Sequence, residues 1–195
     1  MSTRGLWGFK FHDEKKLTYN QSDSYPSGLG LKLKHQLSDY TIDRMKERFD
    51  KIALVHPDAK PLPEIVEKLI QYKYYAPSEF RKDELKEWYS LLRAWQGNMK
   101  PYLQYAMPIM VDGLPYIEST EYIYVIDLDD EAFVETKSGL SVPLNNLTRD
   151  GNIISDNAFL RKMGESEDEE EQEEDGDFEM PIDEVMSRLG IKTLI

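Results

Sequence analysis

The chain has 195 residues, of which 40% are hydrophobic and none is cysteine, and its formal net charge is −13 at pH 7. This length supports one domain with a substantial core plus an appendage, and the lack of cysteine excludes a disulfide framework, thiolate metal sites and cysteine nucleophiles. The N-terminus lacks the apolar core of a signal peptide, and no apolar run approaches the ~18 residues of a membrane span. We therefore expect a cytoplasmic protein that does not enter a membrane.

The first predicted element is a β-hairpin at the N-terminus. Residues 3–11 are aromatic and apolar, residues 12–15 have turn composition, and residues 16–20 alternate between polar and apolar side chains. Gly5 and Gly8 interrupt the first strand, and a glycine inside a strand indicates a bulge or the close approach of another group to the backbone.

The loop Leu17–Gly30 (LTYNQSDSYPSGLG) follows, and it is the densest collection of special residues in the chain. No helix or strand period fits it, and binding or catalysis is commonly built on such polar loops. Pro26 presets φ for a turn and Gly28 permits a positive φ. A helix is predicted to begin near Gly28–Gly30 and to run to Ser38.

This arrangement predicts a small-ligand site, with an anionic group bound by the first amides of that helix. Arg4 on the first strand would pair bidentately with a phosphate or carboxylate, and Asn20 and Asp23 would orient the ligand or a water. The alternative is that Asp23 caps a turn and residues 26–28 only close a tight connection. The candidate ligand-binding residues are Arg4, Tyr19, Asn20, Asp23, Ser24, Tyr25, Ser27 and Gly28.

Helical patterns dominate the middle of the chain. Thr41 is a candidate N-cap for a helix that continues to Ile52, and further helices are predicted at 62–74 and 78–97. A short helical or extended piece is expected at 101–110. Residues 122–127 (YIYVID) form the clearest strand of the chain, because they are β-branched and aromatic throughout.

A second hairpin is predicted in the C-terminal part of the body. Residues 132–136 return from the strand at 122–127, and residues 141–144 and 152–154 are candidate edge pieces. With helices between two hairpins, the economical fold is α+β, in which one antiparallel sheet is covered by a block of helices.

The negative charge of the chain is concentrated near its C-terminus. Residues 165–179 contain 11 acidic and no basic residues, so removing them from the net −13 leaves −2 on the rest. A nearly neutral body does not favour direct binding of nucleic acid. We therefore predict a globular domain over residues 1–160, a disordered acidic linker over 161–179, and a C-terminal helix over 180–195 that docks on the body or binds a protein partner.

Three matching stretches resemble an uncharacterised family found among phages, bacteria and fungi. They are a TRGxxGF strand at residues 3–9, a YNxxDSYPxGLG loop at 19–30, and a late EYIYVIDLD strand at 121–129. No established activity is known for that family, so the resemblance implies membership without implying a function.

Besides ligand binding, the sequence leaves two alternative functions open. It does not decide whether the protein catalyses a reaction. An interaction or inhibitor protein would use the acidic segment to engage a basic partner. An N-terminal-nucleophile amide hydrolase would use Ser2, exposed by removal of Met1, with its own amine as the base.

No cofactor or metal is predicted. His12, His35 and His56 are widely spaced and share no ligand pattern, and the chain has neither a dinucleotide fingerprint nor a Walker lysine motif. The run at 127–130 (DLDD) would hold Mg²⁺ through paired carboxylates or form a polar hairpin turn, and the frequency of acidic residues in turns favours the turn.

Overall fold

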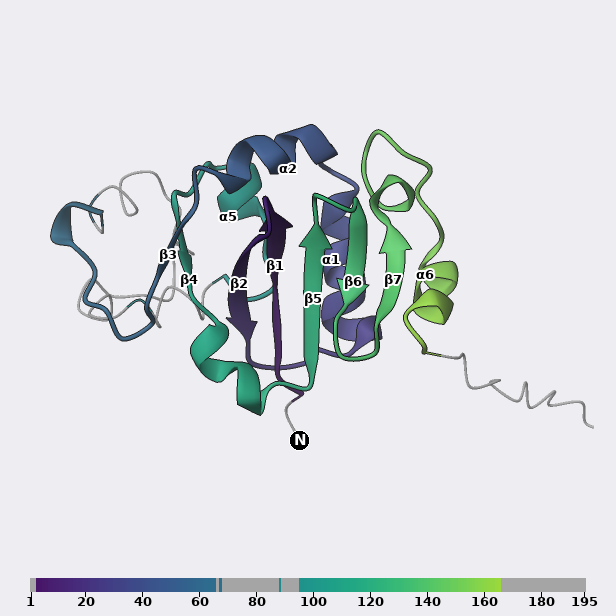
Figure 1. Ribbon diagram of the computed structural model, residues 1–195, viewed down its shortest axis with the longest axis horizontal. Coiled ribbons are helices and arrows are strands. Elements are labelled where there is room, and N and C mark those ends of the chain that lie inside the picture. The colour runs from purple at the N-terminus through teal and green to yellow at the C-terminus, as the bar shows by residue number, and fades with distance from the viewer. Residues whose placement is uncertain (1–2, 66, 68–87, 89–94, 166–195) are drawn as a thin grey trace, which may run out of the picture.

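The computed structural model describes residues 3–65, 67, 88 and 95–165 (Figure 1). The labels below are those of Figure 1, and η marks short turns of 3₁₀- or π-helix. In chain order the elements are β1 (Gly5–Phe11), β2 (Glu14–Asn20), η1 (Pro26–Gly30, π-helical), α1 (Leu31–Leu37), α2 (Ile42–Phe49), β3 (Ala53–Val55), α5 (Lys100–Leu103), β4 (Ile109–Val111), η3 (Leu114–Ser119), β5 (Tyr122–Asp127), β6 (Ala132–Glu135), β7 (Leu140–Pro143), η4 (Leu144–Asn146) and α6 (Asp156–Lys162).

A five-stranded sheet in the order β2-β1-β5-β6-β7 forms the centre of the fold. Both predicted hairpins are present, as β1–β2 and as β5–β6, and the α+β class is confirmed. The sheet is mixed rather than wholly antiparallel, because β1 pairs with β5 in parallel, with Gly5 opposite Tyr122. Residues 12–121 connect this parallel pair, and within them β2 runs antiparallel to β1 and returns the chain to the end of the sheet where β5 begins.

A second, two-stranded sheet extends the molecule beyond β2. Strands β3 and β4 pair in parallel, and the Gly113 amide that follows β4 donates a 2.8 Å hydrogen bond to the Leu17 carbonyl of β2. Sequence patterns did not predict β3, because a strand of three residues is too short to show a period.

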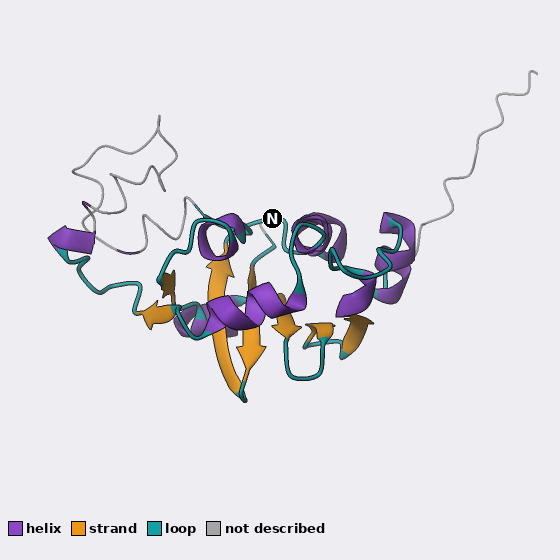
Figure 2. Ribbon diagram, turned by 90° about the horizontal axis from the view of Figure 1, so that it is seen from above, coloured by secondary structure: helices purple, strands orange, loops and turns teal. Residues whose placement is uncertain are grey.

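Aromatic side chains join the sheet to its helices. Trp7 of β1 lies with its ring centroid 6.1 Å from that of Tyr102 in α5, and Phe133 of β6 lies 5.6 Å from Phe159 of α6. Figure 1 and Figure 2 show α1 on one side of the sheet, behind β5 and β6 in the first view. The loop that precedes α1 is therefore held beside the ends of the central strands.

Two helices begin at side-chain caps, as their sequences require. Thr41 Oγ1 accepts the Arg44 amide at 3.2 Å, which confirms the predicted N-cap of α2. Ser155 Oγ accepts the Ala158 amide at the same distance and begins α6. The predicted edge piece at 152–154 is not a strand, because these residues form the irregular lead into that cap.

Helix α6 runs through the predicted boundary at residue 160. Phe159 is fully buried and Met163 is 4% exposed, so the packed body reaches Met163. The predicted acidic linker and C-terminal helix lie almost wholly outside the described residues, as do Ser2 and most of the helices predicted at 62–74 and 78–97. In the described parts of the chain, no helix is long and apolar enough to cross a membrane.

Candidate functional site

A polar cavity of about 470 Å³ opens beside the loop that joins β2 to α1. This volume lies within the range typical of small-molecule sites. We call it the loop cavity. Its lining residues are Asn20, Ser22, Asp23, Tyr25, Gly28, Leu29, Lys32 and Gln96.

The floor of this loop is anchored to the sheet through Ser24, which is fully buried. Its amide donates to the Thr3 carbonyl at 3.2 Å, its hydroxyl accepts Asn20 Nδ2 at 2.8 Å, and its carbonyl accepts the Tyr124 hydroxyl at 2.9 Å. A Cβ on Gly5 would stand 2.7 Å from the Ser24 Cβ, which explains the glycine in β1 as the close approach expected from the sequence. Ser24 is thus a structural anchor and does not line the cavity.

The amides of the π-helical turn η1 donate to carbonyl groups of the loop residues just before it. The Leu29 amide donates to the Asp23 carbonyl at 2.7 Å, and the amides of Gly28 and Gly30 donate to the Tyr25 carbonyl at 3.0 and 3.4 Å. These three amides already have acceptors, so they are not the free donors on which the predicted anion site depends.

The positive φ expected at Gly28 is instead at Asp23, where φ is 54°. Aspartate is one of the few residues other than glycine that adopt this left-handed conformation without large strain. Gly28 is required for a different reason, since a Cβ at this position would lie 2.2 Å from the Asp23 carbonyl oxygen. The two residues together close the loop on itself.

Lys32, in the first turn of α1, supplies the positive charge of the loop cavity. Its Nζ donates to the Gln96 carbonyl at 3.0 Å, and it passes close to Gly97, where a Cβ would stand 3.2 Å from it. Partial burial lowers the pKa of this lysine below its ordinary value. It forms no ion pair with any residue that the structure describes, so an ammonium group faces the cavity with donor capacity to spare.

The segment 95–99 is fixed against α1 by amide side chains. Gln36 Nε2 donates to the Gly97 carbonyl at 2.8 Å, and Gln36 Oε1 accepts the Met99 amide at 2.7 Å. Gln96 Oε1 accepts the Gln21 amide at 3.0 Å. These contacts place Gln96 opposite the loop as the far wall of the cavity.

A second hollow of about 410 Å³ adjoins the loop cavity along α1. It shares Lys32 and Gln96 with that cavity, and we call it the α1 hollow. Its full lining is Lys32, His35, Gln36, Gln96, Asn98 and Lys100. The lining contains no carboxylate.

Asp156 of α6 is the carboxylate beside this hollow. It lies 2.9 Å from His35 Nε2 and 2.6 Å from Lys34 Nζ. The hydrogen bond from Lys34 is the first of the contacts that lower the pKa of Asp156 below its usual value, with His35 second. This carboxylate is therefore shared between two basic groups.

The structure brings half of the sequence-predicted residues together at the cavity. Asn20, Asp23, Tyr25 and Gly28 line it, whereas Arg4, Tyr19, Ser24 and Ser27 do not. Lys32 and Gln96 line the cavity but were not predicted from the sequence. Lys32 is the second residue after the predicted loop and could have been included in the predicted site, whereas nothing in the sequence near Gln96 indicates that it approaches the loop.

Two of the residues outside the cavity have contacts elsewhere. Tyr19 packs against Tyr116 of η3, with ring centroids 4.7 Å apart. Arg4 exchanges backbone contacts with Glu121, whose amide donates to the Arg4 carbonyl at 2.8 Å. Arg4 lines neither hollow, so the pairing role predicted for it has no counterpart in this geometry.

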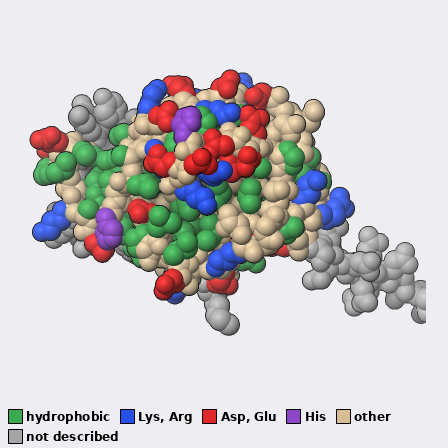
Figure 3. Space-filling view, viewed as in Figure 1, with side chains coloured by type: hydrophobic (Ala, Val, Ile, Leu, Met, Phe, Trp, Pro, Cys, Tyr) green, Lys and Arg blue, Asp and Glu red, His purple; other side chains and the backbone are tan. Residues whose placement is uncertain are grey.

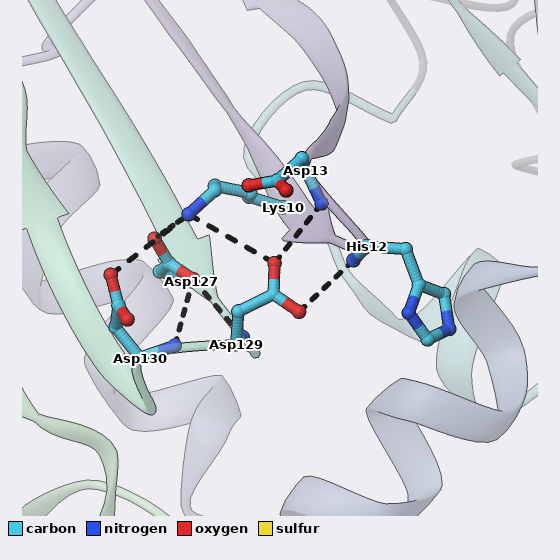
Figure 4. A network of polar contacts seen from close by, with 6 residues as sticks. All are labelled: Lys10, His12, Asp13, Asp127, Asp129 and Asp130. Atoms are coloured by element: carbon cyan, nitrogen blue, oxygen red, sulfur yellow. Dashed lines mark hydrogen bonds and ion pairs between the residues drawn. The ribbon is translucent and has the colours of Figure 1, made fainter.

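The opposite end of the sheet carries a compact charged cluster (Figure 4). Lys10 Nζ lies 2.8 Å from Asp127 Oδ2, while Asp127 Oδ1 accepts the amides of Asp129 and Asp130 at 3.1 Å each. Burial alone would raise the pKa of Asp127, but the hydrogen bond from Lys10 and the two amides lower it below its usual range.

Asp129 closes the β1–β2 hairpin turn from outside. His12 and Asp13 have φ of 52° and 60°, and their amides donate to the two carboxylate oxygens of Asp129 at 3.0 and 3.2 Å. Figure 3 shows acidic and basic side chains gathered at this end of the molecule. The carboxylates act as turn acceptors, and no group of three His, Cys, Asp or Glu side chains in the described segments is placed to hold a metal.

Comparisons with protein-family models, with curated proteins and with solved structures found no match for this chain. The family resemblance carried by residues 3–9, 19–30 and 121–129 therefore stays a prediction.

Proposed function

We propose that the protein binds a small polar ligand in the loop cavity, with Lys32 meeting an anionic group of that ligand. The observation that carries the proposal is the Lys32 ammonium, which lines a polar cavity and makes no ion pair with a described residue. An ammonium group that has no opposite charge beside it gains Coulomb energy from an incoming anion.

Two other groups in the lining suit the uncharged part of such a ligand. The Asp23 carboxylate has no hydrogen-bond or ion-pair partner among the described residues, so it is available to accept from a hydroxyl or amine. Tyr25 is 38% exposed and presents an aromatic face to a ligand.

The test is a thermal-melt screen against nucleotides, sugar phosphates and small amides. A ligand at a hundred times its dissociation constant adds about 2.7 kcal/mol of stability, which shifts the melting temperature measurably. We expect a shift in the wild type that Asp23→Asn and Lys32→Gln each reduce. Lys15→Gln, at an exposed position on β2 away from the cavity, is the matched control and should keep the full shift.

A shift that all three variants retain would place the ligand elsewhere and overturn the proposal. The alternative functions depend on Ser2 and on residues 166–195, which the structure does not describe, so they stay predictions.

A further inference from the structure

We propose that the α1 hollow is a phosphate subsite, so that the ligand of this protein is a small phosphomonoester whose uncharged polar part occupies the loop cavity. This inference rests on the proposed function and assigns the ligand class to it. It is carried by the adjacency of the two hollows, which share Lys32 and Gln96, and by the positive charge of the α1 hollow.

The loop cavity and the α1 hollow adjoin each other along α1 and along segment 95–100. Lys32, His35 and Gln36 lie three and four residues apart, so they share one face of the helix. Lys32 and Gln96 line both hollows. The two hollows therefore meet at Lys32 and Gln96, and the proposal places one ligand across both of them.

The charge of the α1 hollow matches a dianion. Lys32 and Lys100 contribute two ammonium groups, and neither makes an ion pair with a described residue, whereas Lys10 and Lys46 each lie within 2.9 Å of a carboxylate. A phosphomonoester carries about −1.5 to −2 at neutral pH. A carboxylate carries only −1 and would leave one ammonium group uncompensated.

Hydrogen-bond donors complete the subsite. Asn98 Oδ1 accepts the Lys100 amide at 3.1 Å, which leaves the Asn98 side-chain NH₂ without a partner in the described segments. The side-chain amide of Gln36 is already hydrogen-bonded to Gly97 and Met99. Gln36 therefore lines the hollow without contacting the ligand through a free donor. His35 lies at the rim, where Asp156 holds its ring.

Inorganic phosphate is the first probe. Its binding to the full chain is monitored through the NMR chemical shifts of the backbone amides at constant ionic strength. We expect saturable shifts at Lys32, Asn98 and Lys100. Removing one charged hydrogen bond should weaken binding about tenfold, so Lys32→Gln and Lys100→Gln should each raise the apparent dissociation constant by that factor. Lys15→Gln should not change it.

Three results with phosphate and acetate would overturn the assignment. The first is phosphate-induced shifts that do not saturate, and the second is phosphate binding that Lys32→Gln and Lys100→Gln both retain. Equal binding of acetate would assign the hollow to a carboxylate instead of a phosphate.

Matched ligand pairs separate this inference from the proposed function. Glucose and glucose 6-phosphate, and adenosine and its 5′-monophosphate, are compared in the wild type and in Lys100→Gln, because Lys100 lines only the α1 hollow. Tighter binding of a phosphorylated member, lost in Lys100→Gln down to the affinity of its unphosphorylated partner, would support the inference.

Equal binding of both members of a pair, insensitive to Lys100→Gln but reduced by Asp23→Asn, would overturn the phosphate subsite and leave only the binding of a small polar ligand in the loop cavity. Binding by neither member of either pair, together with non-saturating phosphate shifts, would overturn both.

Discussion

The two ends of strand β1 carry similar residue types in opposite states. At the C-terminal end, the side chains of Lys10, Asp127 and Asp129 are bound to one another and to turn amides at 2.8–3.2 Å. Beside the N-terminal end, Lys32 and Asp23 face a cavity and make no ion pair with a described residue. The first cluster is closed and stabilises a turn, whereas the second retains binding capacity. Charge type alone does not distinguish a structural cluster from a binding site; the completeness of its contacts does.

The largest effect should come from the glycine that closes the loop. Gly28→Ala places a Cβ 2.2 Å from the Asp23 carbonyl oxygen, whereas at Gly30 the nearest atom would be 3.5 Å away. We expect Gly28→Ala to lower the free energy of unfolding by about 2–3 kcal/mol. Gly30→Ala should leave it unchanged or raise it by up to about 1 kcal/mol. Urea denaturation measures both, and equal effects would show that the loop is not closed in this way.

The anchor beneath the loop gives the next largest effect. Tyr124→Phe removes the hydroxyl that donates to the buried Ser24 carbonyl at 2.9 Å. Leaving that carbonyl without its partner should cost about 1–2 kcal/mol. Tyr122→Phe is the matched control on the same strand, because the Tyr122 hydroxyl has no hydrogen bond to a described residue. A loss in Tyr122→Phe as large as in Tyr124→Phe would contradict the anchor.

A smaller, pH-dependent effect tests the closed cluster. Asp127→Asn keeps the Oδ1 acceptor for two amides but removes the ion pair with Lys10. Because the folded pKa of Asp127 lies below its usual 3.8, this stabilisation is present above that value and is lost as the pH falls through the folded pKa.

The hydrogen bond to Asp127 also raises the pKa of Lys10 above its usual 10.5. On the alkaline side, the ion pair is therefore lost only when the pH rises through this raised pKa. We therefore expect wild type to exceed Asp127→Asn in stability at pH 7, and the gap to close on acidification below 3.8, as the pH falls through the folded pKa of Asp127. Urea midpoints across this range provide the measurement. Asp130→Asn, whose side chain is 78% exposed, should show no comparable gap, and a gap that persists unchanged at acid pH would refute the ion pair.

The smallest effect on stability should come from Lys32, beside the N-terminal end of β1, where the charged groups have no ion pair with a described residue. Lys32→Gln breaks no ion pair with a described residue and removes an exposed charge, so the free energy of unfolding without ligand should change by no more than about 0.5 kcal/mol. A loss of several kcal/mol would show that Lys32 is structural and would remove the contrast between the two ends.

Local sequence determined the parts of this protein that depend on near neighbours. The β-branched and aromatic run at 122–127 specified β5, because such side chains suit a pleated surface. Thr41 specified the start of α2 through a hydrogen bond only three residues away. Ser155 offered the same signal for α6, which could have been predicted from it.

Tertiary structure alone decided the parallel pairing within the sheet and part of the cavity lining. The parallel pairing of β1 with β5 joins residues more than 100 positions apart, and no local period encodes it. Gln96 reaches the loop because amide side chains fasten its segment to α1. The turn amides predicted to bind an anion were taken by the carbonyls of Asp23 and Tyr25. Residue types specify which contacts a side chain can make, and only the folded arrangement determines which of them are already satisfied.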